Sequence, residues 1–141
     1  MVIQRWQTVF LFVTAVFMAL FTFMPYATTT VDGVVVELAP SNSMVYMIVN
    51  ILTIIIAFIS IFMYRDLRKQ VRTVKLVMLL IVCAAVTGAL LLFGPNAPSN
   101  GVELCITGGL PFLIGSLIFS SLALRGIRKD QKILASNDRI R

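Results

Sequence analysis

Histidine is absent from this 141-residue chain, and cysteine and tryptophan are scarce, with two Cys and one Trp. Without His there is no imidazole to act as a general base or metal ligand, which removes the commonest group in both kinds of site. Cys83 and Cys105 stand apart, at different expected depths, so we expect neither a disulfide nor a thiolate metal site. Paired carboxylates and a phosphate-binding glycine loop are also missing. We therefore expect no enzyme, no cofactor and no metal.

Charged residues are scarce too, at 13% of the chain against 59% hydrophobic, and the mean hydropathy is +0.96. Four apolar runs contain no charged residue, and about 20 helical residues are enough to cross a hydrocarbon core of ~30 Å. The sequence predicts an all-α integral membrane protein, a four-helix bundle forming one domain over residues 1–141, with spans at about 7–26, 44–64, 74–93 and 108–126. The first run could be a cleavable signal peptide, but it is long and its cleavage site is poor, so we favour a retained span.

All twelve basic residues fall before, between or after these runs in one pattern. One precedes the first run, five lie between the second and third, and six follow the fourth: Arg5; Arg65, Arg68, Lys69, Arg72 and Lys75; Arg125, Arg128, Lys129, Lys132, Arg139 and Arg141. The other two connections carry only acidic charges. By the positive-inside rule, both termini and the middle loop are cytoplasmic. Trp6 and Tyr64 then mark the inner interface, and Tyr26 and Tyr46 the outer one.

The outer connection after the first span contains a turn signal. Asp32-Gly33 is flanked by Thr and Val, which favour strands, so residues 28–38 predict a short β-hairpin, with an irregular loop as the alternative. Ser41 or Ser43 is expected to cap the second helix. Pro111 fits the first turn of the fourth helix, where a missing N–H costs little.

Small and polar residues inside the spans predict helix packing. Asn50 is expected to bond to a neighbouring helix. Ala84, Ala85, Gly88 and Ala89 in the third span and Gly115, Ser116, Ser120 and Ala123 in the fourth repeat at four-residue spacing. We expect these two sets to form one close helix contact, although they could equally serve a homodimer. A pore would need a polar stripe at helical spacing, and the sequence suggests only scattered Thr, Ser and Asn.

The cytoplasmic tail, residues 127–141, follows the last span and is basic. Residues 125–141 hold six basic residues against Asp130 and Asp138, which favours contact with anionic lipids. Nucleic acid is excluded as a partner because the tail has no aromatic residue for base stacking. Proton-coupled transport is disfavoured because the four apolar runs, roughly 9–26, 44–64, 76–93 and 109–124, contain no charged residue.

Both ends of the chain resemble one family. Ile3, Gln4, Arg5, Gln7 and Thr8 are similar to its opening pattern, and the ending matches at Arg125, Ile127, Arg128, Lys129, Asp130, Ser136, Asp138, Arg139 and Arg141. The family is an uncharacterised group of four-helix inner-membrane proteins from Bacteroidota, domain of unknown function 4293. Gln131 and Ile140 depart from it, where an acidic residue and Leu are usual. The resemblance implies a bacterial inner membrane and assigns no activity.

Two functions remain open from the sequence. The first is an accessory subunit of a larger membrane complex, in which a helical tail docks a partner through its Arg128-Lys129-Asp130 and Asp138-Arg139 charges. The second is a small oligomeric channel or lipid-handling protein. For both functions we expect Arg5 to lie close to Asp130 or Asp138, with Asp66 as the next candidate, because all four residues are predicted at the inner surface.

The topology gives a direct labelling test. A membrane-impermeant thiol reagent applied to intact spheroplasts should modify Cys105, expected in an outer loop, and leave Cys83 unmodified. In a variant that carries Ser136→Cys, the new thiol should be protected until the membrane is permeabilised. Labelling of that thiol in intact spheroplasts would place the tail outside and reverse the predicted orientation.

Overall fold

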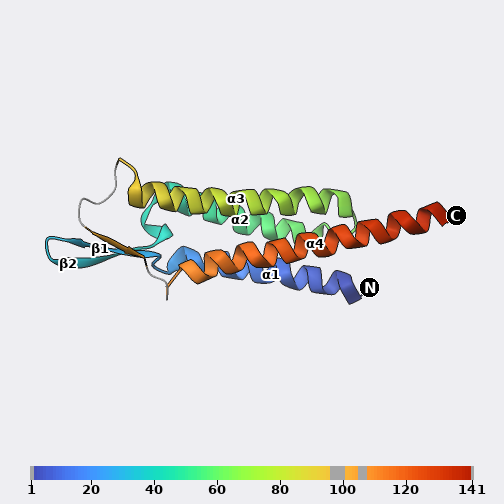
Figure 1. Cartoon of the computed structure of the whole chain (residues 1–141), viewed down its shortest axis with the longest axis horizontal. Coiled ribbons are helices and arrows are strands. Elements are labelled where there is room, and N and C mark those ends of the chain that lie inside the picture. Colours follow the sequence, from blue (N-terminus) through green and yellow to red (C-terminus); the bar gives the residue numbers. More distant parts are fainter. Residues whose placement is uncertain (1, 96–100, 105–107, 141) are drawn as a thin grey trace.

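Four long helices and a small sheet make up the computed structural model, which describes residues 2–95, 101–104 and 108–140, with side chains from Trp6 onward (Figure 1). The helices are α1 (Val2–Phe23), α2 (Met44–Phe62), α3 (Leu67–Phe93) and α4 (Leu110–Ile140), with a short 3-10 turn η1 at Pro40–Asn42. The strands are β1 (Ala27–Val31), β2 (Val34–Leu38) and β3 (Val102–Leu104). All four helices are long and apolar enough to cross a membrane, as predicted.

The predicted hairpin is confirmed, and it belongs to a larger sheet than expected. β1 pairs antiparallel with β2, and the chain turns at Asp32 and Gly33, which both have positive φ, 51° and 80°. Positive φ at both central residues fits a tight hairpin turn and explains the Asp-Gly pair. β3 adds to the other edge of β1, giving the order β2-β1-β3. Three residues carry too weak a pattern to reveal β3 from sequence.

The helix ends follow simple capping chemistry in part. Asp66 caps α3, since its carboxylate accepts a hydrogen bond of 3.2 Å from the backbone N–H of Lys69, which holds the pKa of Asp66 below its usual value. Pro111 lies in the first turn of α4, as predicted. Ser43 occupies the N-cap position of α2, but its hydroxyl makes no capping bond, so only the position was predicted correctly.

The four helices form a closed ring in which α1 contacts α2 and α4, and α3 contacts α2 and α4. Both chain ends lie at the same end of the bundle, and the sheet lies at the other (Figure 1). α4 continues well past the last apolar residue of its span as one uninterrupted helix, and its final turns project beyond the other helices (Figure 1). Large apolar side chains are exposed along all four helices, among them Phe12, Ile55, Leu79 and Ile118. Such a surface is suited to a lipid solvent.

Tyr26 and Tyr46 lie at the sheet end of the bundle, as expected, but they face inward. Both are buried, and together with Phe21 they form an aromatic cluster with ring centroids 5.5 to 6.3 Å apart. They mark the end of the bundle as predicted, but their rings are buried, whereas Trp6 and Tyr64 at the opposite end are exposed. Tyrosine is amphipathic, so a position at the end of a span did not reveal whether its ring points to lipid or core.

Gly88 of α3 makes room for this cluster. A Cβ atom at Gly88 would lie 2.7 Å from Tyr46 Oη, and the Tyr46 ring is held by its aromatic neighbours. We expect Gly88→Ala to lower the free energy of unfolding in detergent by about 1–3 kcal/mol, the usual cost of overpacking. Gly101→Ala is the matched control, because nothing lies within 4 Å of its Cβ position. Equal stability of the two variants would contradict this close packing.

Candidate interaction sites

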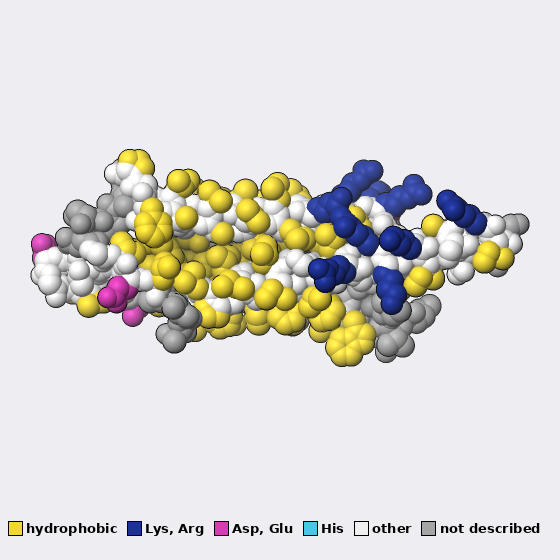
Figure 2. Space-filling view, in the orientation of Figure 1, with side chains coloured by type: hydrophobic (Ala, Val, Ile, Leu, Met, Phe, Trp, Pro, Cys, Tyr) yellow, Lys and Arg dark blue, Asp and Glu magenta, His cyan; other side chains and the backbone are white. Residues whose placement is uncertain are grey.

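The basic side chains gather at one end of the bundle, around α3, α4 and the turn before α3 (Figure 2). The acidic side chains in this view lie at the opposite end, on the sheet. Among the described residues, the single ion pair joins Lys69 to Asp66 at 3.4 Å. Most of the positive charge at this end is therefore free to attract anions from outside the chain.

Beneath this charge, α1 and α4 are joined by a buried polar contact. Gln7 Nε2 donates a hydrogen bond of 2.6 Å to Asp130 Oδ2, and the two residues are only 3% and 9% exposed. Gly126, one turn before Asp130, lies against the Gln7 side chain, and a Cβ there would come within 2.9 Å of Gln7 Cγ. These residues come from the two ends of the sequence that resemble the family patterns. Their shared role is to fasten the first helix to the last.

The contact from Gln7 brings the start of the chain to Asp130, one of the three carboxylates expected near Arg5. The side chains of Gln4 and Arg5 lie outside the described residues, so their contacts remain predictions. Asp130 itself is buried against Gln7, and its proposed place in a partner-docking surface is therefore wrong. The sequence thus indicated that the two ends of the chain meet, but it gave no sign that the Gln7 amide would be the donor to Asp130.

The remaining charged residues of the family-like ending stay exposed. Arg125, Arg128, Lys129, Asp138 and Arg139 all lie on the surface of α4. Asp138 borders a cavity of about 550 Å³ formed between the projecting part of α4 and the turn that precedes α3, whose lining includes Arg65 and Arg68. Asp66 lines the same cavity. Both signs of charge thus meet on the inner face of the projecting helix.

The small residues of α3 and α4 do not form the one close contact that we expected. Gly88 faces Tyr46 of α2, and Gly115 seats Phe17 of α1, whose Cε2 would be 2.5 Å from an added Cβ. Ser116 donates to Met18 Sδ of α1 at 3.3 Å as well as to the carbonyl of Leu113. The spacing correctly indicated close approach. It did not reveal that aromatic rings, rather than a facing stripe of small residues, fill the space.

Three others of this set are buried, and the remaining two lie elsewhere. Ala123 is buried in the core cluster that includes Leu11 of α1 and Val74 of α3. Ala84 is buried in the core cluster at the sheet end, and the Ser120 hydroxyl donates to the carbonyl of Leu117 in its own helix. Ala85 and Ala89 are exposed and line an apolar groove between α3 and α4. α3 and α4 are therefore separated by a groove where sequence spacing predicted their tightest packing.

A polar face on α2 was missed by the sequence analysis. The buried residues of α2 recur at spacings of four and three: Tyr46, Asn50, Thr53, Ala57 and Ser60. The spacing of Tyr46, Asn50, Thr53 and Ser60 is visible in the sequence and could have revealed the stripe, because the exposed positions of α2 are all Ile, Leu, Val, Phe or Met. α2 therefore turns its polar side inward.

The polar groups of this face mostly bond within their own helix. Asn50 Nδ2 donates to the carbonyl of Tyr46 at 2.9 Å, so the predicted bond from Asn50 to another helix is wrong. Thr53 likewise donates to Val49, four residues earlier. Asn50 Oδ1 and Ser60 Oγ are buried and have no partner among the described residues. Gln70 of α3 donates to the Ser60 carbonyl of α2 at 3.3 Å, and Thr73 of α3 donates to Sδ of Met63, the C-cap residue of α2, at 3.4 Å.

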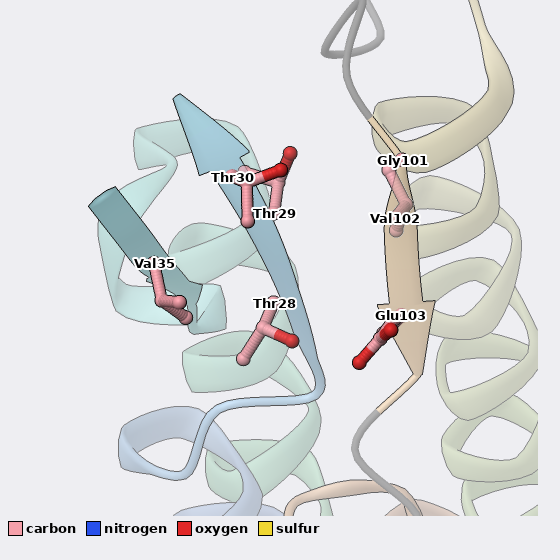
Figure 3. Close-up of a pocket in the computed structure, with 7 residues that line it drawn as sticks. All are labelled: Thr28, Thr29, Thr30, Val35, Gly101, Val102 and Glu103. Carbon is pink, nitrogen blue, oxygen red and sulfur yellow. The ribbon is translucent and has the colours of Figure 1, made fainter. Parts of the chain in front are cut away.

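The sheet end holds a further cavity, of about 400 Å³, over the paired strands β1 and β3, with Val35 of β2 also in its lining (Figure 3). Figure 3 shows the threonines of β1 on one side and Glu103 extending from β3 toward β1 on the other. Within residues 2–95, 101–104 and 108–140, no group of three Cys, Asp or Glu residues is placed to hold a metal ion. Cys83 is free and exposed on α3, and Cys105 lies outside the described residues.

These features define a small, mostly helical protein with four candidate membrane spans and one strongly basic end. The chain belongs to the family described as domain of unknown function DUF4293, whose model matches residues 3–140. The resemblance seen at the two ends thus extends over almost the whole chain. No curated protein and no solved structure matches it.

The contact between Gln7 and Asp130 can be measured by a double-mutant cycle. Gln7→Leu leaves a buried carboxylate without its donor, so we expect the free energy of unfolding to fall by about 1–3 kcal/mol. Adding Asp130→Leu should recover much of that loss, because two apolar side chains replace the pair. Thermal or denaturant unfolding in one detergent provides the measurement. Additive losses in the double variant would show that the two side chains do not interact.

Proposed function

We propose that this protein is an accessory subunit of a larger complex in the bacterial inner membrane, with both termini in the cytoplasm. The placement is supported by the exposed apolar surface of the four helices and by the gathering of basic side chains at the end that holds both termini. The absence of any charged residue from the four apolar runs disfavours coupled transport.

The observation that carries the proposal is the projecting end of α4. Ile133, Leu134 and Ile140 are apolar, yet they are 44%, 52% and 84% exposed. They lie past the apolar run of α4, where lipid tails would not cover them. Ile133 and Ile140 are seven residues apart, so they share one face of the helix, which Leu134 borders. Burial of one such side chain is worth ~1.5–3 kcal/mol, so this face is suited to a groove or helix of another protein.

A lipid surface is a poorer partner for this face. α4 continues along the bundle axis, so its last turns lead away from the proposed membrane rather than along its surface (Figure 1). Ten residues of helix carry the tip about 15 Å outward. Asp138 and Arg139 flank the apolar positions and are exposed, so they are placed to orient a protein partner by charge.

The polar face of α2 favours one second candidate, a small uncoupled channel. Asn50 Oδ1 and Ser60 Oγ are unpaired groups inside the bundle, and water in a pore would satisfy both. Against this function, the Asn50 amide and the Thr53 hydroxyl are engaged by their own helix. Asn50→Leu should abolish ion or water flux into proteoliposomes if the channel exists and leave no change if it does not.

The docking surface can be tested without disturbing the bundle. Truncation after Gln131 removes the projecting turns and retains both Gln7 and Asp130. We expect this variant to remain in the membrane fraction and to lose the native proteins that co-purify with the full chain in mild detergent. Membrane fractionation and quantitative mass spectrometry provide the two measurements.

Point variants locate the contact within the projecting helix. Ile133→Ser combined with Ile140→Ser should lower partner recovery tenfold or more, since two apolar contacts are lost. Ala135→Ser, on another face of the same turns, is the matched control and should retain the partners. A full-length chain that purifies only with copies of itself would reject the accessory role and favour the channel.

A further inference from the structure

An apolar groove runs between α3 and α4 on the outer surface of the bundle (Figure 2). It encloses about 340 Å³, and its walls include Val82, Ala85 and Ala89 from α3 and Ile114 and Leu117 from α4. The small side chains of Ala85 and Ala89 leave this space open. Ala85 lies near the middle of the apolar run of α3, so the groove is centred about halfway across the proposed membrane.

The groove continues toward the basic end of the molecule. Leu117 also lines a second cavity, of about 240 Å³, that extends along α4 past Ser121 to Arg125. Ile118, Ser121 and Arg125 recur at three and four residues, so they form one stripe on the helix. Figure 2 shows dark-blue basic side chains at this end of the groove. The apolar groove thus ends at the cationic side chain of Arg125.

Lys75 supplies a second cation on the facing helix. It is exposed and lies two turns before Val82, on the same side of α3 that forms the groove wall. Ten residues separate Lys75 from Ala85, which at ~1.5 Å each is about 15 Å, half the thickness of a hydrocarbon core. Arg125 lies two turns after Ile118 on α4. Both cations are therefore at headgroup depth when the groove lies in the acyl layer.

No acidic side chain among the described residues neutralises these two cations. Asp66 pairs with Lys69, and Asp130 accepts from Gln7. Asp138 lies thirteen residues beyond Arg125 on the same helix, about 20 Å away. The charge at the end of the groove is thus available to an anion that reaches it from the lipid.

We propose that the groove is a specific binding site for an anionic glycerophospholipid of the inner leaflet. One acyl chain lies along Ala85 and Ala89, and the phosphate is held by Arg125 and Lys75. The inference rests on the membrane placement given under the proposed function and is independent of the docking surface on α4. A phosphate diester suits this pair, since arginine offers a planar set of donors and lysine a mobile point charge.

A second copy of this chain fits the groove less well. If two copies packed through Ala85 and Ala89, Lys75 and Arg125 of one copy would lie beside the same end of a helix in the other copy. The cytoplasmic end of each span in this protein is flanked mainly by basic residues, so parallel copies would set like charges together. A lipid phosphate removes that conflict.

The site predicts selective retention of one lipid class. We would purify the full chain in detergent, add phosphatidylglycerol or phosphatidylcholine, and measure bound lipid by native mass spectrometry and thermal stabilisation. Lys75→Gln combined with Arg125→Gln should weaken phosphatidylglycerol binding about 25-fold, at roughly fivefold for each basic residue. The matched control, Arg65→Gln with Arg139→Gln, removes the same charge from the turn before α3 and from the tip of α4, away from the groove, and should retain the binding.

A steric variant tests the acyl part of the site. Ala85→Phe should fill the groove and abolish retention of phosphatidylglycerol, whereas Cys83→Phe, also exposed on α3 but outside the groove, should not. Equal binding by the charge variant and its control would overturn the proposal, because it would reveal only general attraction to anionic lipid. A dimer that Ala85→Phe disrupts would overturn it in favour of a second copy. Resistance of each variant to carbonate extraction reports separately on membrane placement.

Discussion

Satisfaction of polar groups within a single helix is the constraint on which this structure depends. A helix exposed to lipid must bond its own backbone, and here most side chains of the interior follow the same rule. Thr14, Thr22, Asn50 and Thr53 each donate to the carbonyl four residues earlier. Such back-bonding makes a polar residue nearly self-sufficient. The helices are then held together mainly by packing, and rings that lie over Gly88 and Gly115 provide the closest contacts.

Against this background, polar bonds that cross between helices at the basic end are conspicuous. Gln7 meets Asp130, and Gln70 meets the Ser60 carbonyl. Each joins neighbours in the ring, α1 to α4 and α2 to α3. Both lie near the end of the apolar runs, where water can solvate the groups during assembly and the cost of a mismatched polar group is smaller. Directional bonds therefore fix the arrangement of the helices at this end, and aromatic packing fixes it at the other.

The sequence was sufficient for the helices, the hairpin and the charged end because each depends on strong local signals. Long apolar runs, an Asp-Gly turn and a one-sided charge pattern need no knowledge of tertiary contacts. Partner choice could not be predicted in the same way. The spacing of Gly88 and Gly115 indicated close approach but not the rings that fill it, and Tyr26 and Tyr46 could face either lipid or core. Asp130 looked like a surface charge because its partner, Gln7, lies at the other end of the chain.

The length of α4 has a mechanical consequence. The helix runs without a break from Leu110 to Ile140, about 45 Å, and its first turn is tied to the chain beside the sheet because the Gly109 amide bonds to the Pro25 carbonyl. An uninterrupted helix is stiff, so the sheet and the exposed apolar tip are joined by one rod. Its buried side chains and the bond from Gln7 to Asp130 hold this rod in the bundle, so the position of the tip is fixed relative to the sheet.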